Sequence, residues 1–231
     1  MTALRWPRWF FTACLGALLL LLVLLVIGWW RELATASAPT QSPPAITSMP
    51  TVVAGDCPLP PRVARGAAPL QSALPDGLAA FEHPAAQLLP LAGFSVDARV
   101  LSRARYDDDR EALLAPTDLA LAWGRMREDA VLQRLDIRQA DRWYHFAWAD
   151  PQPPLPPPEM VASSANMHMV PADPAIATAL ASVQPGQQVR IDGWLIEARA
   201  ADGWRWRSSL RRDDTGRGAC EVVYVCAVSV Q

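Results

Sequence analysis

The chain contains no lysine: its 21 basic residues are all arginine, and Asn166 is its only asparagine. Alanine, proline and arginine abound instead, a composition typical of a GC-rich bacterial genome rather than of one function. Charge of neither sign prevails, because 23 acidic residues leave a net charge of −2. A domain that binds nucleic acid over its whole surface is strongly basic, so this balance argues against nucleic acid as a partner.

Charge is missing altogether from residues 9–30, which read WFFTACLGALLLLLVLLVIGWW. A helix needs about 20 apolar residues to cross a bilayer core, so this run predicts a transmembrane helix. It exceeds the apolar core of about 7–15 residues of a cleaved signal peptide, which favours an uncleaved signal-anchor over cleavage after Ala36-Ser37-Ala38.

The arginines that flank this run predict its orientation. Arg5 and Arg8 lie in the n-region 1–8, whereas Arg31 is the only basic residue between the run and Arg62. The positive-inside rule then leaves the N-terminus in the cytoplasm and the rest outside. We therefore expect a single-pass protein of the inner membrane with a periplasmic domain, and the lipid bilayer as a partner through residues 9–30.

Cysteine is scarce, and three of the four cysteines follow the apolar run. A periplasm permits disulfides. Cys220 and Cys226 on one strand would lie about 20 Å apart, whereas a disulfide needs Cα atoms within about 7 Å. Cys57 could pair with either Cys220 or Cys226, or all three could be reduced.

The remainder divides by composition into three parts. Residues 31–61 are rich in proline, alanine, serine and threonine, which predicts a semi-extended linker. Residues 62–91 form a transition segment that prolines interrupt. We expect one folded domain over residues 92–231, since about 140 residues can bury a core of their own.

Residue patterns within that domain predict an α+β fold. Alternation and β-prone residues predict strands at 94–102, 143–148, 188–199, 204–210 and 220–230, the last three as an antiparallel meander. Helical signals cover 116–123, 128–135 and 174–183, and residues 150–158 predict polyproline II. The expected architecture is a small, mostly antiparallel sheet or partly open barrel with short helices, compatible with an OB-like or SH3-like barrel.

Two clusters carry chemistry that would need further ligands. Met167-His168-Met169, with Met160 nearby, offers the soft ligands that suit copper. The alternative is that both methionines pack in the core, since real sites need about three to four ligands.

Cys220 with His168 and Asp214 could form a cysteine-nucleophile enzyme. A cysteine that begins an apolar strand is more often buried and inert, and the polar flank of Asp214-Thr215-Gly216 favours a turn over an aspartic-protease triplet. The sequence therefore assigns no catalytic residue and no cofactor.

A basic face with tryptophans behind it is the best candidate for an interaction surface. Outside the membrane, such a face suits an anionic envelope polymer or an acidic envelope protein. Its candidate residues are Arg190, Arg205, Arg207 and Arg211.

Three stretches, SSANMHMVPAD, VRIDGWLIEA and GWRWRSSLRRDDTGRGACEVVYV, lie between Phe94 and Val225. This part of the chain resembles a set of uncharacterised bacterial membrane-anchored envelope proteins. Because no activity is assigned to that set, the resemblance implies only one domain behind an N-terminal anchor. The leading hypothesis is a membrane-attached protein whose periplasmic domain binds an envelope partner; the alternatives are the Cys220 enzyme and the copper-handling module.

Overall fold

The computed structural model describes residues 22–26, 51–211, 214 and 218–231. Contacts divide the chain into two units, Met1–Ile46 and Thr47–Gln231. In the first unit, Leu22–Val26 form a helical turn. No helix among the described residues is both long and apolar enough to cross a membrane. The expected transmembrane helix is thus not shown, and the rest of 9–30 lies outside the described residues, as do 31–50 of the expected linker.

The second unit is mostly β, so the expected α+β class is wrong: 43% of the described residues are in strands and 17% in helices. The strands are β1 (Val52–Val53), β2 (Leu70–Ser72), β3 (Phe81–His83), β4 (Ala86–Arg105), β5 (Thr117–Ala122), β6 (Asp136–Ala140), β7 (Trp143–Ala147), β8 (Ser164–Pro171), β9 (Gln188–Arg199), β10 (Arg205–Arg207) and β11 (Glu221–Val230). The helices are η1 (Glu111–Leu113), η2 (Gly124–Arg127), α2 (Asp129–Leu132), α3 (Pro157–Ala162) and α4 (Pro174–Ser182).

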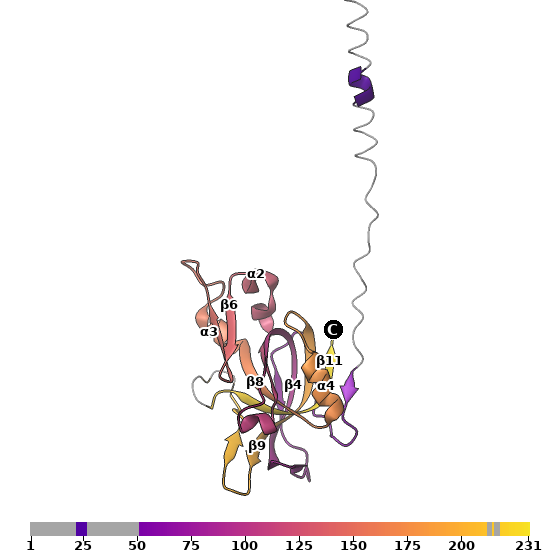
Figure 1. Cartoon of the computed structure of the whole chain (residues 1–231), viewed down its shortest axis with the longest axis vertical. Helices are drawn as coiled ribbons and strands as arrows, with labels where there is room; N and C mark the ends of the chain where they lie inside the picture. The colour runs from indigo at the N-terminus through magenta and orange to yellow at the C-terminus, as the bar shows by residue number, and fades with distance from the viewer. Residues whose placement is uncertain (1–21, 27–50, 212–213, 215–217) are drawn as a thin grey trace, which may run out of the picture. The chain divides into compact units, whose positions relative to one another are not determined.

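Among the described residues, nine strands form one large mixed sheet, and its central strands close on themselves (Figure 1). Four strand pairs are antiparallel: β4–β5, β5–β8, β4–β9 and β9–β11. The pair β8–β11 is parallel. Counted along the chain, the five closing strands follow the order 1-2-3-5-4-1, with α4 between the third and fourth. This is the strand order of the OB fold. The expected meander is wrong, because β10 and β11 pair with successive parts of β9 and not with each other.

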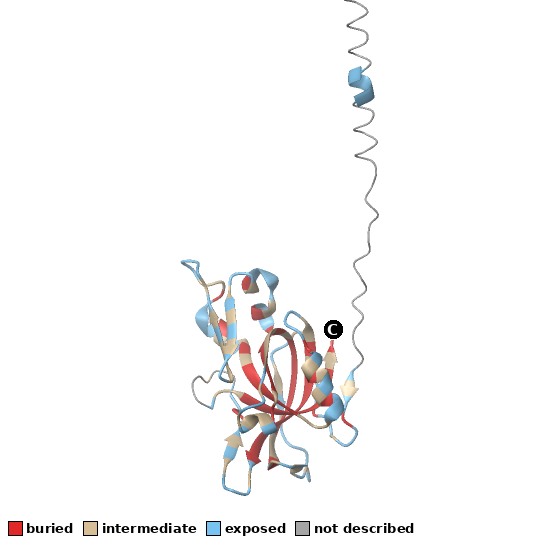
Figure 2. Cartoon of the chain, viewed as in Figure 1, coloured by how far each residue is buried: buried red, intermediate tan, exposed pale blue. Residues whose placement is uncertain are grey.

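Alternating apolar residues fill the inside of this closed sheet. Phe94 and Val96 of β4 are at most 1% exposed, and the same cluster takes in Leu119, Met167 and Ile191 from β5, β8 and β9. In Figure 2 the central strands are red almost throughout, whereas the outer loops and helices carry the pale blue. Burial of this apolar area is the main force that holds the strands together.

The helix α4 covers one end of this core. Asp173 caps it by accepting a hydrogen bond from the Ile176 backbone N–H at 2.8 Å, and Pro174 stands in its first turn. Ile176 and Leu180 point into the core, as their spacing predicts. This helix is confirmed in type and position.

Gly193 is required where β9 passes β11. A Cβ atom there would collide with the carbonyl oxygen of Tyr224, which is backbone and cannot move aside. The register of β11 shifts nearby, between Val225 and Ala227. The close approach lets the two strands cross tightly and close the sheet.

Residues 51–66 cover the outer, polar face of β4 and β9. Asp192 binds Ser95 at 2.5 Å and Arg62 at 2.9 Å, and Asp97 binds Arg190 at 3.0 Å. Alternation alone would place these polar side chains of β4 and β9 in solvent, but they are buried. Each buried carboxylate also has a partner in the segment that covers it, Arg62 for Asp192 and the Gly66 backbone N–H for Asp97 at 3.1 Å.

A disulfide joins this segment to the last strand. Of the two pairings that the sequence left open, the structure contains Cys57–Cys226, with Cα atoms 5.4 Å apart and a sequence separation of 169. Among the described cysteines, Cys220 is the free one. The bridge closes a long loop, which restricts the unfolded chain strongly.

Residues 123–163 form an insertion between β5 and β8. It contains η2, α2, the β6–β7 hairpin and α3, around a small cluster that includes Met126 and Met160. The strand at 143–147 and the turn at 129–132 are confirmed. The helix expected at 116–123 is wrong, since Thr117–Ala122 form β5, and the expected polyproline segment ends in α3 from Pro157.

Candidate functional site

A groove of about 740 Å³ lies over the outer face of β8. Four regions supply its walls: the β4–β5 connection, the start of β7, the strand β8, and the β9–β11 connection with β10. Its lining residues are Glu111, Arg142, Trp143, His168, Arg205, Trp206, Arg207, Gly218 and Cys220.

Asp118, on β5, holds the floor of this groove together. Its side chain is fully buried and lies opposite His168 in the β5–β8 register. One carboxylate oxygen lies 2.9 Å from His168 Nδ1 and accepts a hydrogen bond from Asn166 Nδ2 at 3.1 Å. The other oxygen accepts from Arg142 Nη1 at 3.2 Å. Because Nδ1 is engaged, Nε2 is the nitrogen of His168 left for other contacts.

Arg142 occupies the tip of the β6–β7 hairpin and joins three parts of the site. Asp141 and Arg142 have φ values of 51° and 62°, as the central residues of a type I′ turn require. Neither is glycine, so this backbone is strained and needs support from its surroundings. Arg142 provides such support by binding both carboxylate oxygens of Asp109 at 2.6 Å.

Rings enclose the Arg142 guanidinium as well. It lies 4.2 Å from the centre of the Tyr106 ring and 5.7 Å from that of Trp206. Burial alone would lower the pKa of Arg142, but its hydrogen bonds to Asp109 and the charge of Asp118 outweigh burial and raise it. The same hydrogen bonds lower the pKa of Asp109. The Arg142–Asp109 ion pair therefore stays charged at neutral pH, and Arg142 also donates to Asp118, which holds the tip of the hairpin against β5.

The rim along β10 carries excess positive charge. Glu197 on β9 is shared by three arginines, at 2.6 Å from Arg199, 2.5 Å from Arg207 and 4.0 Å from Arg205. Hydrogen bonds from Arg199 and Arg207 lower the pKa of Glu197. One carboxylate thus balances one of three positive charges, and the side chains of Arg205 and Arg207 are 68% and 54% exposed.

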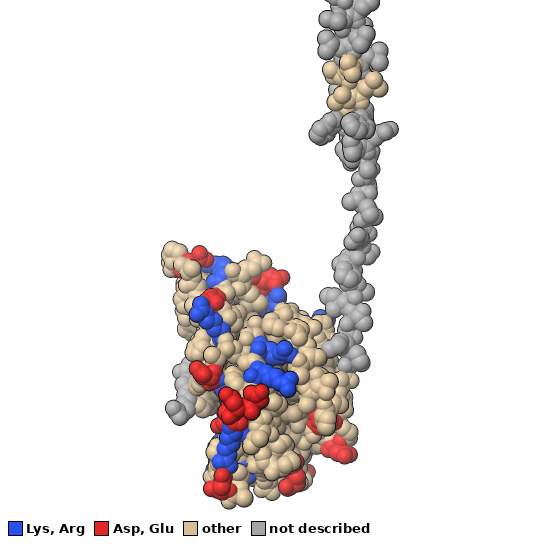
Figure 3. Space-filling view, viewed as in Figure 1, with Lys and Arg blue, Asp and Glu red and all other residues tan. Residues whose placement is uncertain are grey.

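Tryptophan rings lie between these charges. Trp206 packs against the ring of His168, with centres 4.8 Å apart, and its ring centre is 6.1 Å from that of Trp204. Trp143, Trp204 and Trp206 are all partly exposed. On the face that Figure 3 shows, acidic and basic atoms lie side by side, so that face as a whole is not basic.

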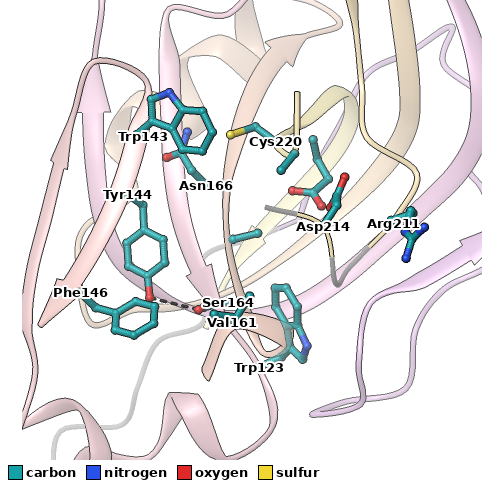
Figure 4. A pocket seen from close by; sticks show the side chains of 13 residues that line it. Trp123, Trp143, Tyr144, Phe146, Val161, Ser164, Asn166, Arg211, Asp214 and Cys220 are labelled. Atoms are coloured by element: carbon teal, nitrogen blue, oxygen red, sulfur yellow. Dashed lines mark hydrogen bonds between the residues drawn. The ribbon is translucent and has the colours of Figure 1, made fainter. Parts of the chain in front are cut away.

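A smaller cavity of about 160 Å³ adjoins the groove and shares Trp143 and Cys220 with it (Figure 4). It lies between the β6–β7 hairpin, α3 and the starts of β8 and β11. Its lining residues are Trp123, Trp143, Tyr144, Phe146, Val161, Ser164, Ala165, Asn166, Arg211, Asp214, Ala219, Cys220 and Glu221.

Cys220 lies beside both cavities but lacks the environment of a nucleophile. Burial raises its pKa to about 12, so about one thiol in 10⁵ is ionised at pH 7. His168 also borders the groove, but its Nδ1 faces Asp118, while Asp214 accepts a hydrogen bond from Ser209 at 2.6 Å. The structure thus brings Cys220 and His168 to one groove and pairs the histidine with a different aspartate.

The candidate copper ligands point in different directions. Met167 and Met169 are fully buried inside the closed sheet, Met160 belongs to the cluster of the insertion, and His168 faces the groove. Within the described parts of the chain, no group of three or more His, Cys, Asp or Glu side chains could hold a metal ion.

The four arginines of the candidate interaction face also separate. Arg205 and Arg207 lie together on β10, and Arg211 lines the smaller cavity. Arg190 lies under residues 62–66, where it donates to the Val63 carbonyl at 2.6 Å and to Asp97.

Sequence reasoning missed Arg142 and Asp118 as site residues. Arg142 stands at the turn between two alternating segments, a hairpin signal in which an arginine is unusual. Asp118 had no such signal, since its neighbours were assigned to a helix. No known family model, curated protein or solved structure matches the chain at a significant level.

Proposed function

We propose that residues 51–231 form a binding domain that holds an anionic oligosaccharide segment of an envelope polymer in the groove over β8. The observation that supports this most is the sequence along β10, where partly exposed Trp204 and Trp206 alternate with Arg205 and Arg207. The two arginines share one carboxylate, that of Glu197, so positive charge is in excess there.

Tryptophan faces suit sugar rings because the carbon-bound hydrogens of a sugar form flat apolar surfaces. A partly exposed tryptophan offers a large, rigid area for such a surface and loses little conformational freedom on binding. Two of the three tryptophans, Trp143 and Trp206, line one groove. A chain of sugar rings in the groove can therefore contact both tryptophans.

The arginines suit carboxylate or phosphate groups on that chain. A guanidinium binds either group through two parallel hydrogen bonds. Arg205 and Arg207 are separated by one residue on a strand, so both side chains leave the same face of β10. Negative groups that repeat along a polymer could reach both at once.

The position of the groove supports a binding role by analogy of fold. OB folds bind oligosaccharides and oligonucleotides over the second and third strands and the adjoining loops. Here those strands are β5 and β8: His168 of β8 lines the groove, and Asp118 of β5 lies beneath it, 2.9 Å from His168 Nδ1. Fold alone does not establish function, so the chemistry of the lining carries the proposal.

The domain is further proposed to face the periplasm at the inner membrane, from the composition and flanking charges of residues 9–30. The disulfide is consistent with an oxidising compartment. Carbonate extraction of membranes, followed by protease treatment of spheroplasts, tests this part. A protein found only in the soluble fraction would overturn it.

Calorimetric titration of the purified domain with an oligomer of galacturonic acid tests the binding role. A neutral cello-oligosaccharide of equal length is the matched control ligand. We expect saturable binding of the anionic oligomer and at least tenfold weaker binding of the neutral one, since a tenfold difference needs only about 1.4 kcal/mol.

The double variant Arg205→Glu/Arg207→Glu should lose at least tenfold in affinity for the anionic oligomer. Arg134→Glu/Arg138→Glu changes the net charge equally at two exposed arginines outside the groove, and should bind as wild type. Equal losses in both variants would mean a non-specific charge effect. Single-stranded DNA that binds tightly while both sugars fail would replace the proposal.

A further inference from the structure

We infer that the smaller cavity is a second, separate binding site, which takes one uncharged six-membered ring. Aromatic side chains surround it: Trp143, Tyr144 and Phe146 lie along the hairpin side and Trp123 at the far end (Figure 4). Val161 of α3 adds an aliphatic wall. Only Trp143 and Cys220 of its lining residues also line the groove, and Arg205 and Arg207 do not line it, so the inference does not rest on the proposed function.

The volume fits a ring of this size. An engineered apolar cavity of about 150 Å³ holds one benzene molecule, and this cavity measures about 160 Å³. A longer polar chain would not fit within it.

The polar groups on the hairpin side of the cavity are already engaged in hydrogen bonds. The Tyr144 hydroxyl donates to Ser164 Oγ at 3.1 Å, and Ser164 donates in turn to the Met160 carbonyl at 2.7 Å. The Asn166 amide donates to Asp118 and to the Arg142 carbonyl, and accepts from Gln139. Two charged lining residues, Arg211 and Asp214, lie on the other side (Figure 4), where Asp214 accepts a hydrogen bond from Ser209 at 2.6 Å. An uncharged ring would disturb none of these bonds.

The cavity is held in shape by the same contacts that build the groove. Arg142 fixes the hairpin tip, and the hairpin carries Trp143, Tyr144 and Phe146. Because the cavity is formed before binding, little free energy is needed to order the protein around a ligand. Because Trp143 and Cys220 border both spaces, a compound with a ring and an anionic chain could occupy both.

Fluorine NMR of 4-fluorophenol with the purified domain tests this site. We expect saturable line broadening with a Kd on the order of 1 mM, which is typical for a probe of this size, and displacement by uncharged cyclohexanol. No saturable effect on the wild-type domain would overturn the inference.

Val161→Phe would fill the cavity and should weaken 4-fluorophenol binding at least tenfold. Val53→Phe makes the same change at a position on β1 that is 49% exposed, and should leave binding unchanged. If Val161→Phe misfolds by circular dichroism, the smaller change Val161→Met provides the second test. Unchanged binding in a folded filled variant would place the probe elsewhere and refute the site.

Cross-measurements separate this inference from the proposed function. Val161→Phe should still bind the galacturonic acid oligomer, and Arg205→Glu/Arg207→Glu should still bind 4-fluorophenol. If the wild-type domain binds the oligomer and not 4-fluorophenol, the second site is refuted and the groove is not. If it binds 4-fluorophenol and not the oligomer, the proposed function is refuted and the second site is not.

Discussion

Replacement of Asp118 by asparagine should destabilise the domain more than any other single polar change in the groove. Its carboxylate is fully buried and contacts Arg142, His168 and Asn166 at 2.9–3.2 Å. Hydrogen bonds to a charged group contribute about 1.5–3 kcal/mol each, and loss of one partner from a buried ion pair costs about 3–5 kcal/mol. Asparagine keeps the shape and one acceptor, and Arg142 keeps Asp109, so we expect a loss of about 2–4 kcal/mol.

Urea denaturation followed by tryptophan fluorescence measures this loss, provided that the slope of the transition is unchanged. Asp109→Asn is the matched control, because it removes the other carboxylate bound by Arg142. The Asp109 side chain is 33% exposed, so water can replace part of what is lost, and about 1 kcal/mol is expected. The reasoning is refuted if Asp118→Asn costs no more than Asp109→Asn.

Four further outcomes follow from the structure. Cys57→Ser should lower the free energy of unfolding by about 2–5 kcal/mol relative to the oxidised wild type, and a reductant should then have no further effect. Gly193→Ala should cost at least about 3 kcal/mol in urea denaturation, because its Cβ meets the backbone of Tyr224, whereas Gly55→Ala, with open space around it, should cost well under 1 kcal/mol. Glu197→Gln should lower the free energy of unfolding at neutral pH, because a carboxylate whose pKa is lowered in the folded state stabilises the fold only while it is ionised. The difference in unfolding free energy between variant and wild type should therefore shrink as the pH falls below about 4.5. A constant difference down to acid pH would contradict this. Cys220 should react with an aromatic disulfide reagent at pH 7.5 roughly a thousandfold more slowly than free cysteine, because burial raises its pKa to about 12. In the urea-unfolded chain it should react at the rate of free cysteine.

Local patterns in the sequence predicted the strands at 188–199 and 220–230 and the helix that Asp173 caps. Both strands are rich in β-branched and aromatic residues, which favours a strand even though most of their residues are buried on both faces. The strand β5 was taken for a helix because all six of its residues are buried. A strand that is buried on both faces shows no alternation and cannot be distinguished from a short buried helix by pattern alone.

Pairing between distant strands could not be predicted in the same way. The parallel pair β8–β11 and the closing pair β9–β11 depend on where whole strands lie. The need for glycine at position 193 likewise arises only from the backbone of Tyr224, which lies beside it in the folded chain. The sheet became large and mixed for this reason, not small and antiparallel. The polar side chains of β4 and β9 likewise gained partners from residues 62–66, which an isolated strand pattern cannot reveal.

The site was predicted in part. Arg205 and Arg207 were chosen for their alternation with tryptophan, and the structure places both at the groove. Asp118 and Arg142 were missed because each acquires its role from residues 24 to 50 positions away, through the hydrogen bonds between them and to His168. Such a network forms only after the insertion folds back over β5 and β8.

The most direct test of the binding groove is a titration of the ¹⁵N-labelled domain with the galacturonic acid oligomer, observed at the indole N–H signals of the tryptophans. Trp206 and Trp143 should shift and saturate together. Trp194, which is buried and donates to the Pro58 carbonyl at 2.9 Å, should stay unchanged. Shifts of the groove tryptophans that saturate with the anionic oligomer and not with the neutral one are predicted; no saturable shift, or equal shifts with both oligomers, would contradict an anion-selective groove.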